Sequence, residues 1–159
     1  MKPTLEKIVV NTGIGRLAAL PEFEAKLLPS VMADLAAITG QKPQVRPARQ
    51  SISGFKIRTG MIVGLRVTLR GKRMRDFLNR VVNITLPRVR DFRGIPKKNI
   101  DRGGVLTIGI RDHVSFPEIK PQNSKASFGI EFTLVPSTAI PDKEEAIRFY
   151  QSLGILFER

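Results

Sequence analysis

The clearest alternation of apolar and polar residues runs over residues 62–70, IVGLRVTLR. Its odd-numbered positions from 63 to 69 are aliphatic, whereas Arg66, Thr68 and Arg70 fall on the opposite face. A half-buried β-strand requires a period of two residues, so this range is predicted to be a strand. The other expected strands are shorter or less regular: residues 5–11, 43–48, 104–110 and 127–135.

Three longer ranges carry apolar residues at the spacing of an amphipathic helix. They are residues 21–39, 72–84 and 141–153. Pro29 predicts a kink or two short helices within the first range, and Gly40 is expected to end it. The side chains of the second range that should face the core are those of Met74, Phe77, Val81 and Ile84.

Prolines indicate where one of these strands lies in the sheet and where the last helix begins. Pro43 and Pro47 place the strand over 43–48 at a sheet edge or next to an irregularity, because proline cannot donate to a strand ladder. Pro141 suits the first turn of the last helix, where Asp142 and its acidic neighbours complement the positive end of the helix dipole.

The predicted order of elements is β-α-β-β-α-β-β-α, without repeats or a dividing linker. We expect a single domain over residues 1–159 of the α+β class. A mostly antiparallel sheet of about five strands, with helices packed mainly on one face, covers the core and leaves the basic residues exposed. Residues 111–126 are polar and form a long loop, a type of segment that is often functional.

The net charge of +13 changes this picture because it is unevenly distributed. Residues 41–98 carry sixteen cations and only two acids, whereas the charges of residues 1–40 cancel and those of residues 99–159 nearly cancel. Charge concentrated in this way needs an anionic partner, and a nucleic-acid backbone is the usual one. An anionic membrane surface is the alternative, although the apolar helix faces are needed for the core.

Several other classes fit the sequence poorly. No apolar run approaches the ~18 residues that a membrane helix needs. Cysteine is absent, which excludes disulfides and thiolate metal sites. A phosphate-ester enzyme would need a converging set of acids, bases or a metal site, and the sequence shows none, so we expect no catalytic residue, no cofactor and no metal.

Residues 13–18, GIGRLA, match the G-x-G-x-x-A pattern of dinucleotide-binding turns. That fold also requires an acidic residue at the end of a second parallel strand, whereas Asp34 lies in a helical pattern. We therefore expect a flexible turn whose backbone donors are exposed and could meet an RNA phosphate.

His113 is the single histidine, so a zinc site is not expected. We expect it to lie in the loop without a catalytic role. The acids that cluster late in the chain are expected to form a solvated face or a partner surface: Asp112, Glu118, Glu131, Asp142, Glu144 and Glu145.

The outward residues of the strand over 62–70 form a regular row of hydrogen-bond donors. Alternate residues of a strand lie about 7 Å apart, which suits contact with a phosphate backbone. Sheet-type RNA readers add exposed aromatic residues that stack on bases, but the basic region contains only Phe55, Phe77 and Phe92. Recognition of phosphates and of folded RNA shape is therefore favoured over base stacking.

Five collinear stretches resemble the family of bacterial universal large-subunit ribosomal protein five, the ribosomal proteins that bind 5S rRNA. They are EKIVVNTGIG (6–15), ITGQKP (38–43), SISGFKIRTGMIVGLRVTLRG (51–71), FLNRVVNITLPRVRDFRGI (77–95) and FPEI (116–119). The resemblance runs from about residue 4 to the end of the chain, and LPRVRDFRG and VTLRG are its most specific parts.

The resemblance implies a non-catalytic ribosomal protein of the cytoplasm, held in the central protuberance of the large subunit, with no membrane partner. Its implied partners are 5S rRNA, large-subunit rRNA, P-site tRNA, a protein of the small-subunit head and other central-protuberance proteins. The implied contacts with 5S rRNA are Asn11, Thr12, Gly13, Gln41, Lys42, Arg49, Arg66, Thr68 and Arg70.

Two loops receive further roles from the same resemblance. The basic loop within residues 49–61 is similar to the one that reaches a P-site tRNA, through Ser51, Ser53, Gly54, Phe55, Lys56 and Arg58. The late loop is similar to a region that forms an intersubunit bridge, with Asp112, His113, Pro117 and Glu118 as the implied contacts.

The sequence departs from the family pattern in four places, one of which is a first helical region a few residues longer that contains Pro29. Family members usually begin with some twenty more residues that include a helix, whereas this sequence starts almost at the first strand. Gly54 stands where an asparagine is common in the tRNA loop. The stretch KPQNSKAS (120–127) matches the bridge region poorly.

Overall fold

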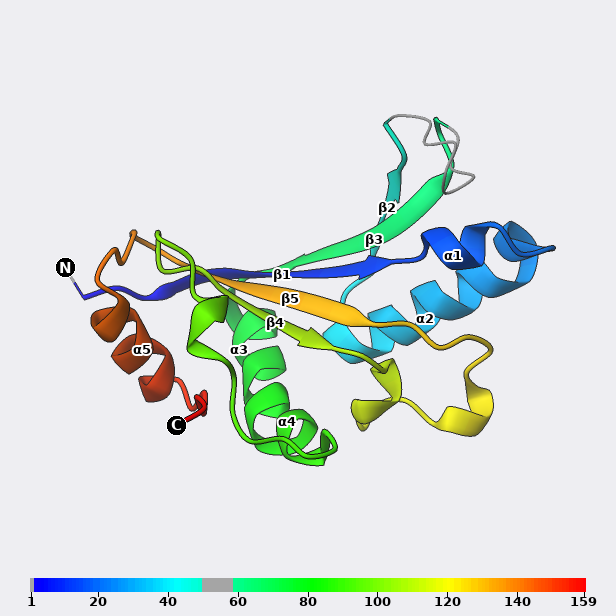
Figure 1. Ribbon diagram of the computed structural model, residues 1–159. Coiled ribbons are helices and arrows are strands. Elements are labelled where there is room, and N and C mark those ends of the chain that lie inside the picture. Colours follow the sequence, from blue (N-terminus) through cyan, green and yellow to red (C-terminus); the bar gives the residue numbers. More distant parts are fainter. Residues whose placement is uncertain (1, 50–58) are drawn as a thin grey trace.

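The computed structural model describes residues 2–49 and 59–159, which form one five-stranded antiparallel sheet with helices on one side (Figure 1). The strand order is β2-β3-β1-β5-β4. The strands are β1 (Leu5–Gly13), β2 (Gln44–Pro47), β3 (Ile62–Leu69), β4 (Leu106–Ile110) and β5 (Ile130–Pro136). The predicted α+β class and element order are confirmed.

The main helices lie below the sheet in Figure 1. They are α2 (Leu28–Thr39), α3 (Gly71–Arg80), α4 (Leu86–Arg88) and α5 (Lys143–Ser152). A short helix that was not predicted, α1 (Gly15–Ala18), follows β1 at the end of the sheet. Short 3₁₀ turns complete the chain: Lys97–Asn99, His113–Ser115 and Pro121–Asn123. None of the helices in the described ranges is long and apolar enough to cross a membrane.

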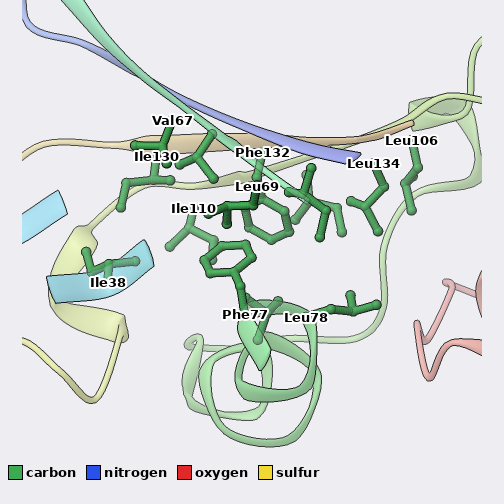
Figure 2. Close-up of a cluster of buried hydrophobic side chains, with 14 of the residues drawn as sticks. Ile38, Val67, Leu69, Phe77, Leu78, Leu106, Ile110, Ile130, Phe132 and Leu134 are labelled. Atoms are coloured by element: carbon green, nitrogen blue, oxygen red, sulfur yellow. The ribbon is translucent and has the colours of Figure 1, made fainter. Parts of the chain in front are cut away.

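The core lies between the sheet and the helices. Every second residue of the central strands is buried, including Val10 and its antiparallel partners Val67 and Phe132. From α3, Phe77 points up at the sheet and meets Phe132 edge to face, with ring centroids 5.5 Å apart (Figure 2). This packing fixes the opposite face of the sheet, because neighbouring residues of a strand point to opposite sides.

Both long helical ranges contain a π-helical turn directly before a Leu-Pro pair. These turns are Phe23–Leu27 before Leu28–Pro29 and Val81–Thr85 before Leu86–Pro87. The amides of Leu28 and Leu86 bond to carbonyls five residues back, instead of four. Proline lacks an N–H and its ring crowds the carbonyl four residues before it, so a widened turn accommodates it.

The widened turn after α3 explains one wrong prediction. It shifts the helical face, so Ile84 is 42% exposed, while Thr85 and Leu86 are buried in its place. The break expected at Pro29 is confirmed as a π-helical turn followed by α2. At the last helix, Pro141 precedes the first turn and Asp142 is the N-cap, where its carboxylate accepts from the Glu144 amide at 3.0 Å.

The prediction for the first proline-flanked strand is confirmed. β2 is four residues long, lies at the edge of the sheet and has an irregular register between Arg46 and Pro47. Together, β2 and β3 form an arm that rises away from the helical side (Figure 1). Backbone bonds between Ala48 and residues 60 and 61 hold its two sides together at 2.9 and 2.7 Å.

Candidate nucleic-acid interface

The face of the sheet turned away from the helices carries polar side chains, and we call it the open face. Asn11 on β1 lies directly opposite Arg66 on β3 and Glu131 on β5, and Arg66 lies opposite Gln44 on β2. The Nε of Arg66 donates to the Oδ1 of Asn11 at 3.4 Å. One row across four strands therefore presents amide, guanidinium and carboxylate groups side by side.

Thr68 and Arg70 extend this polar surface along β3. Thr68 lies opposite Val9 of β1, two residues from Arg66 and on the same face. Arg70 is the N-cap of α3 and keeps an extended backbone, with φ −138° and ψ 160°, so it continues the alternation and is exposed. Arg66, Thr68 and Arg70 thus share one face, as the alternation indicated. Together with Asn11, we call them the polar row.

Gln41 joins three elements at the edge of this surface. Gly40 ends α2 in a left-handed conformation, with φ 79°, which turns the chain toward the sheet. The Nε2 of Gln41 then donates to the Thr68 carbonyl at 3.0 Å, and its Oε1 accepts from Arg73 Nη1 of α3 at 3.2 Å. The side chain is therefore held in a fixed position beside the polar row.

The remaining residues expected to touch 5S rRNA occupy different places. Gly13 is exposed at the end of β1 opposite Gly64, and Lys42 is exposed just after Gln41. Arg49 is exposed and lies five residues beyond Gln44, the partner of Arg66, next to Ala48, which bonds to Gly60 and Met61 of the arm. The structure thus brings most of the predicted residues to the β1–β3 side of the open face but leaves Arg49 apart.

Thr12 corrects the predicted set. Its side chain is only 3% exposed and lies on the helical side of the sheet, where its hydroxyl donates to the Gly129 carbonyl. Because Asn11 faces outward, its neighbour in the strand must face inward. The Thr12 hydroxyl is therefore a structural link between β1 and the segment before β5, and it does not reach the open face.

The glycine-rich turn is also different from expectation. β1 continues to Gly13, Ile14 is 1% exposed, and its amide donates to the Val63 carbonyl at 2.9 Å. α1 then begins at Gly15. The Ile14 donor is used within the sheet, so the prediction of a flexible turn with exposed donors is wrong at this position.

A shallow hollow beside the polar row was not predicted. It lies at the end of the sheet formed by β1, β4 and β5, and glycines at 13, 109 and 129 leave space in it. Asn11, Arg111 and Glu131 contribute its polar groups. Glycines spaced along separate strands carry no local sequence signal, and only the sheet order brings them together.

The residues expected to form the tRNA-contacting loop lie outside the described residues. They are Ser51, Ser53, Gly54, Phe55, Lys56 and Arg58. The described residues on either side of them are Arg49 and Thr59, which follow Ala48 and precede Gly60, a pair whose backbones are hydrogen-bonded.

The expected bridge residues lie in the loop between β4 and β5, below the sheet (Figure 1). Asp112 is exposed and caps the turn His113–Ser115 by accepting from the Val114 amide at 3.2 Å. Pro117 is exposed, whereas Glu118 is half-buried and accepts from Arg80 Nη1 of the helical layer at 2.6 Å. The loop is thereby fastened to α3.

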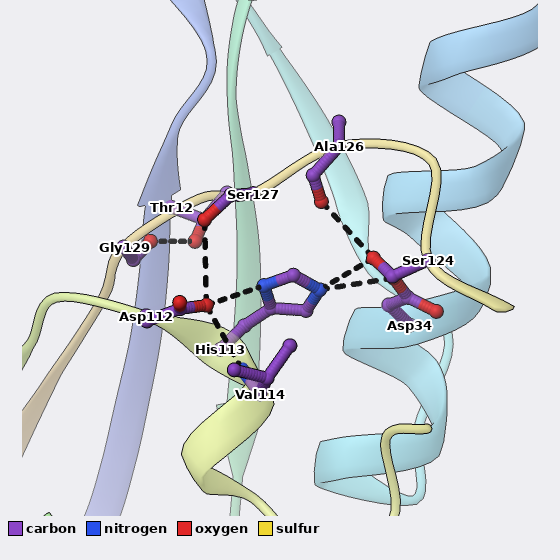
Figure 3. A network of polar contacts seen from close by, with 9 residues as sticks. All are labelled: Thr12, Asp34, Asp112, His113, Val114, Ser124, Ala126, Ser127 and Gly129. Carbon is purple, nitrogen blue, oxygen red and sulfur yellow. Dashed lines mark hydrogen bonds and ion pairs between the residues drawn. The ribbon is translucent and has the colours of Figure 1, made fainter. Parts of the chain in front are cut away.

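His113 is the second correction, because its side chain is 1% exposed and stacks on Phe128 at 3.9 Å (Figure 3). Its Nε2 lies 2.8 Å from the Ser124 hydroxyl and 3.2 Å from the Asp34 carboxylate of α2. Ser124 also donates to Asp34 at 2.9 Å. His113 therefore fastens the loop to α2 and does not present its ring to a partner.

The described residues contain no cluster of three or more histidine, cysteine, aspartate or glutamate side chains that could hold a metal ion. The polar row instead offers neutral amide and hydroxyl groups beside cations. Such groups bind phosphate oxygens and ribose hydroxyls by hydrogen bonds and charge, and they need no chemical step.

Two family descriptions divide the chain between them. Residues 1–58 match "Ribosomal protein L5", and residues 62–157 match "ribosomal L5P family C-terminus". The first match includes β1, Gln41 and β2, and the second includes β3 and the rest of the sheet. The open face is therefore built from both matched parts.

Curated relatives cover nearly the whole chain. The large ribosomal subunit protein uL5 of Rubrobacter xylanophilus is 50% identical over 155 residues, which are 98% of this chain and 83% of the relative. The protein of the same name from Halothermothrix orenii is 45% identical over 157 residues, which are 99% of this chain and 84% of the relative. The chain therefore belongs to the ribosomal protein L5 family.

Proposed function

We propose that this chain is a structural constituent of the large ribosomal subunit that binds 5S rRNA through the β1–β3 side of its open face. Family membership supports the ribosomal role, and it supports a structural, non-catalytic one. The observation that carries the RNA site is the row in which Asn11, Arg66 and Thr68 share a face that the main helices leave uncovered (Figure 1).

The physical fit is to the backbone and ribose of folded RNA. Arg66 is oriented by Asn11, and Gln41 is fixed between Thr68 and Arg73, so the donors are ordered before RNA arrives. Ordering side chains in advance lowers the entropy cost of binding. Arg70 at the end of the row adds a freely exposed cation for phosphate.

Two further contacts belong to the same proposal. The residues between Arg49 and Thr59 contact P-site tRNA, which is consistent with the β2–β3 arm rising beyond the sheet. The loop between β4 and β5 contacts a protein of the small-subunit head, with Asp112 and Pro117 as its exposed groups. Large-subunit rRNA and other central-protuberance proteins are the remaining proposed partners.

The test is a gel-shift titration of the protein with 5S rRNA at fixed salt. Arg66→Ala is expected to weaken binding roughly tenfold, because one charge-assisted contact worth about 1.5 kcal/mol is lost. Thr68→Ala should weaken it as well, while both variants keep the unfolding midpoint of the parent protein in urea.

Thr133→Ala is the matched control, because Thr133 lies on the same face of the sheet but on β5, opposite Val9 and Thr107. Its substitution should leave 5S affinity unchanged. Equal affinity for 5S rRNA and an unrelated RNA duplex at matched salt would refute specific binding, and an equal effect of Thr68→Ala and Thr133→Ala would refute the location of the site.

A further inference from the structure

We propose that the segment from Arg88 to Lys98 is a second RNA-binding surface, which takes the phosphate backbone of an RNA segment other than the one on the open face. We call this segment the basic strap; its cations are Arg88, Arg90, Arg93, Lys97 and Lys98. The inference rests on the proposed function, because it treats the open face as occupied by 5S rRNA.

The basic strap lies on the helical side of the molecule. It begins at the end of α4, runs along the bottom of Figure 1 and then rises to the turn Lys97–Asn99 near β4, whereas the open face and the arm are on the upper side. The helical layer and the sheet stand between the open face and the part of the strap that follows α4, where its three arginines lie. An RNA segment lying on the open face therefore leaves the basic strap uncovered.

Within the part of the chain that the structure describes, the cations of the basic strap have no protein partner. All five are exposed, and none makes a side-chain hydrogen bond or an ion pair with any residue of the described ranges. The nearby cations of α3 differ, because Lys72 pairs with Asp76, Arg73 bonds to Gln41 and Arg80 pairs with Glu118. Unpaired like charges repel one another, and an anionic partner relieves that repulsion.

The backbone that carries these cations is fixed by the end of the chain. The amide of Ile95 donates to the Leu156 carbonyl at 2.7 Å, and the Glu158 amide donates to the Ile95 carbonyl at 3.0 Å. Gly94, with φ 115°, lies so close to Phe157 that a Cβ would be 2.5 Å from its carbonyl carbon. The basic strap is therefore held in one shape, which reduces the entropy cost of binding.

The apolar residues of this region turn inward. Within the basic strap, Ile95 is 5% exposed, Phe92 packs partly buried against the core and Val89 is half-buried, so the fully exposed side chains that the strap presents are mainly its cations. A membrane-surface segment needs bulky apolar groups free to insert. Among the described residues, Leu156, whose carbonyl accepts from the Ile95 amide, is the one strongly exposed aliphatic residue hydrogen-bonded to the basic strap. A phosphate backbone is therefore the better match.

The experiment measures a second binding event on the complex of the protein with unlabelled 5S rRNA. A fluorescently labelled RNA duplex of two helical turns, unrelated to 5S rRNA, is titrated into this complex. A ternary complex is expected, and Arg88→Gln/Arg90→Gln/Arg93→Gln should weaken duplex binding about tenfold or more. The salt slope of duplex binding should also fall by about 0.9 for each phosphate contact removed.

Lys120→Gln/Lys143→Gln/Arg148→Gln is the matched control, because it removes three exposed cations that lie outside the basic strap. This control should retain the second binding event. The basic-strap variant should keep its affinity for 5S rRNA within about twofold, while Arg66→Ala should weaken 5S binding and not duplex binding. Lys97→Gln/Lys98→Gln repeats the test if the arginine variant does not fold.

Three outcomes would overturn the proposal: an equal loss of duplex binding in the control, a parallel loss of 5S affinity in the basic-strap variant, or no loss in that variant. Retention of the protein on vesicles containing phosphatidylserine, without duplex binding, would show that the partner of the basic strap is a membrane surface and not RNA. A failure of 5S binding in the parent protein refutes the proposed function instead, and duplex titrations on the free protein then still test the basic strap.

Discussion

At the scale of single residues, Tyr150 is a buried group whose ionisation is coupled to folding. Its side chain is 0% exposed, and its hydroxyl donates to the Gly104 carbonyl and lies 3.1 Å from the Leu134 carbonyl. Burial away from water raises the pKa of Tyr150 above its usual value near 10, because the phenolate would be desolvated.

This shift predicts a loss of stability at high pH. Above about pH 10 the unfolded chain releases the tyrosine proton while the folded chain keeps it, so the free energy of unfolding falls by up to about 1.4 kcal/mol per pH unit. Tyr150→Phe should cost about 1–3 kcal/mol at neutral pH, because the Gly104 carbonyl loses its donor. The difference between the two proteins should then shrink as the pH rises.

Urea unfolding of both proteins between neutral pH and pH 11 measures this difference. Lysines titrate in the same range, but they are present in both proteins and cancel in the comparison. A difference in unfolding free energy that stays constant across the range would contradict the coupling of Tyr150 to folding.

Residue-scale predictions from the sequence failed where the deciding partner is distant along the chain. The alternation correctly placed Arg66 and Thr68 outward, since the pattern is local. Thr12 and His113 were expected at contact surfaces because of the family resemblance, yet Thr12 bonds to Gly129 and His113 contacts Asp34. These pairs are 117 and 79 residues apart, and no local pattern reveals them.

At the scale of elements, the backbone conformation of Gly94 determines how the basic strap meets the end of the chain. Gly94→Ala places a Cβ 2.5 Å from the Phe157 carbonyl carbon and 2.6 Å from the Glu158 nitrogen at a φ of 115°. Both contacts are with backbone atoms, which cannot move aside as a flexible side chain can. We expect a loss of roughly 2 kcal/mol or more in the free energy of unfolding.

Gly109→Ala is the control, because a Cβ at this exposed position of β4 meets nothing within 4 Å. Its unfolding free energy should be unchanged or slightly higher, since alanine loses less entropy than glycine on folding. Equal urea midpoints for the two alanine variants would show that the close approach at Gly94 does not matter for stability.

The existence and order of elements were predictable, but two details of the helices were not. Apolar periodicity located all five strands and the three helical ranges, and prolines correctly marked β2 as an edge strand. The face change that exposes Ile84 arises from the π-helical turn before Leu86–Pro87. Because the same arrangement precedes Leu28–Pro29, a Leu-Pro pair inside a helical pattern is a usable signal in this chain.

At the scale of the whole molecule, the sequence indicated where charge is concentrated but not how it is divided in space. The excess over residues 41–98 looks continuous along the chain. In the fold, Arg66 and Arg70 are on the open face, whereas the basic strap is on the helical side. Only the arrangement of layers separates them, and that arrangement depends on strand order, which a single sequence does not specify.

The division of charge predicts how 5S rRNA affinity depends on salt. If the open face neutralises about six phosphates, affinity should fall roughly a thousandfold between 50 and 200 mM salt, because bound counterions are released from the RNA. Removing Arg66 and Arg70 together should lower the slope of log affinity against log salt by roughly 1.5–2. The measurement is a salt series of gel shifts for the parent protein and this double variant.

The basic-strap variant provides the contrast in the same salt series. It removes three cations, one more than the open-face variant, so a purely global charge effect would lower the slope more in the basic-strap variant. Binding through the open face predicts the reverse order, with the parent slope nearly retained when Arg88, Arg90 and Arg93 are replaced. A larger drop in the basic-strap variant would mean that 5S rRNA wraps around the helical side, and the two surfaces would then be one site.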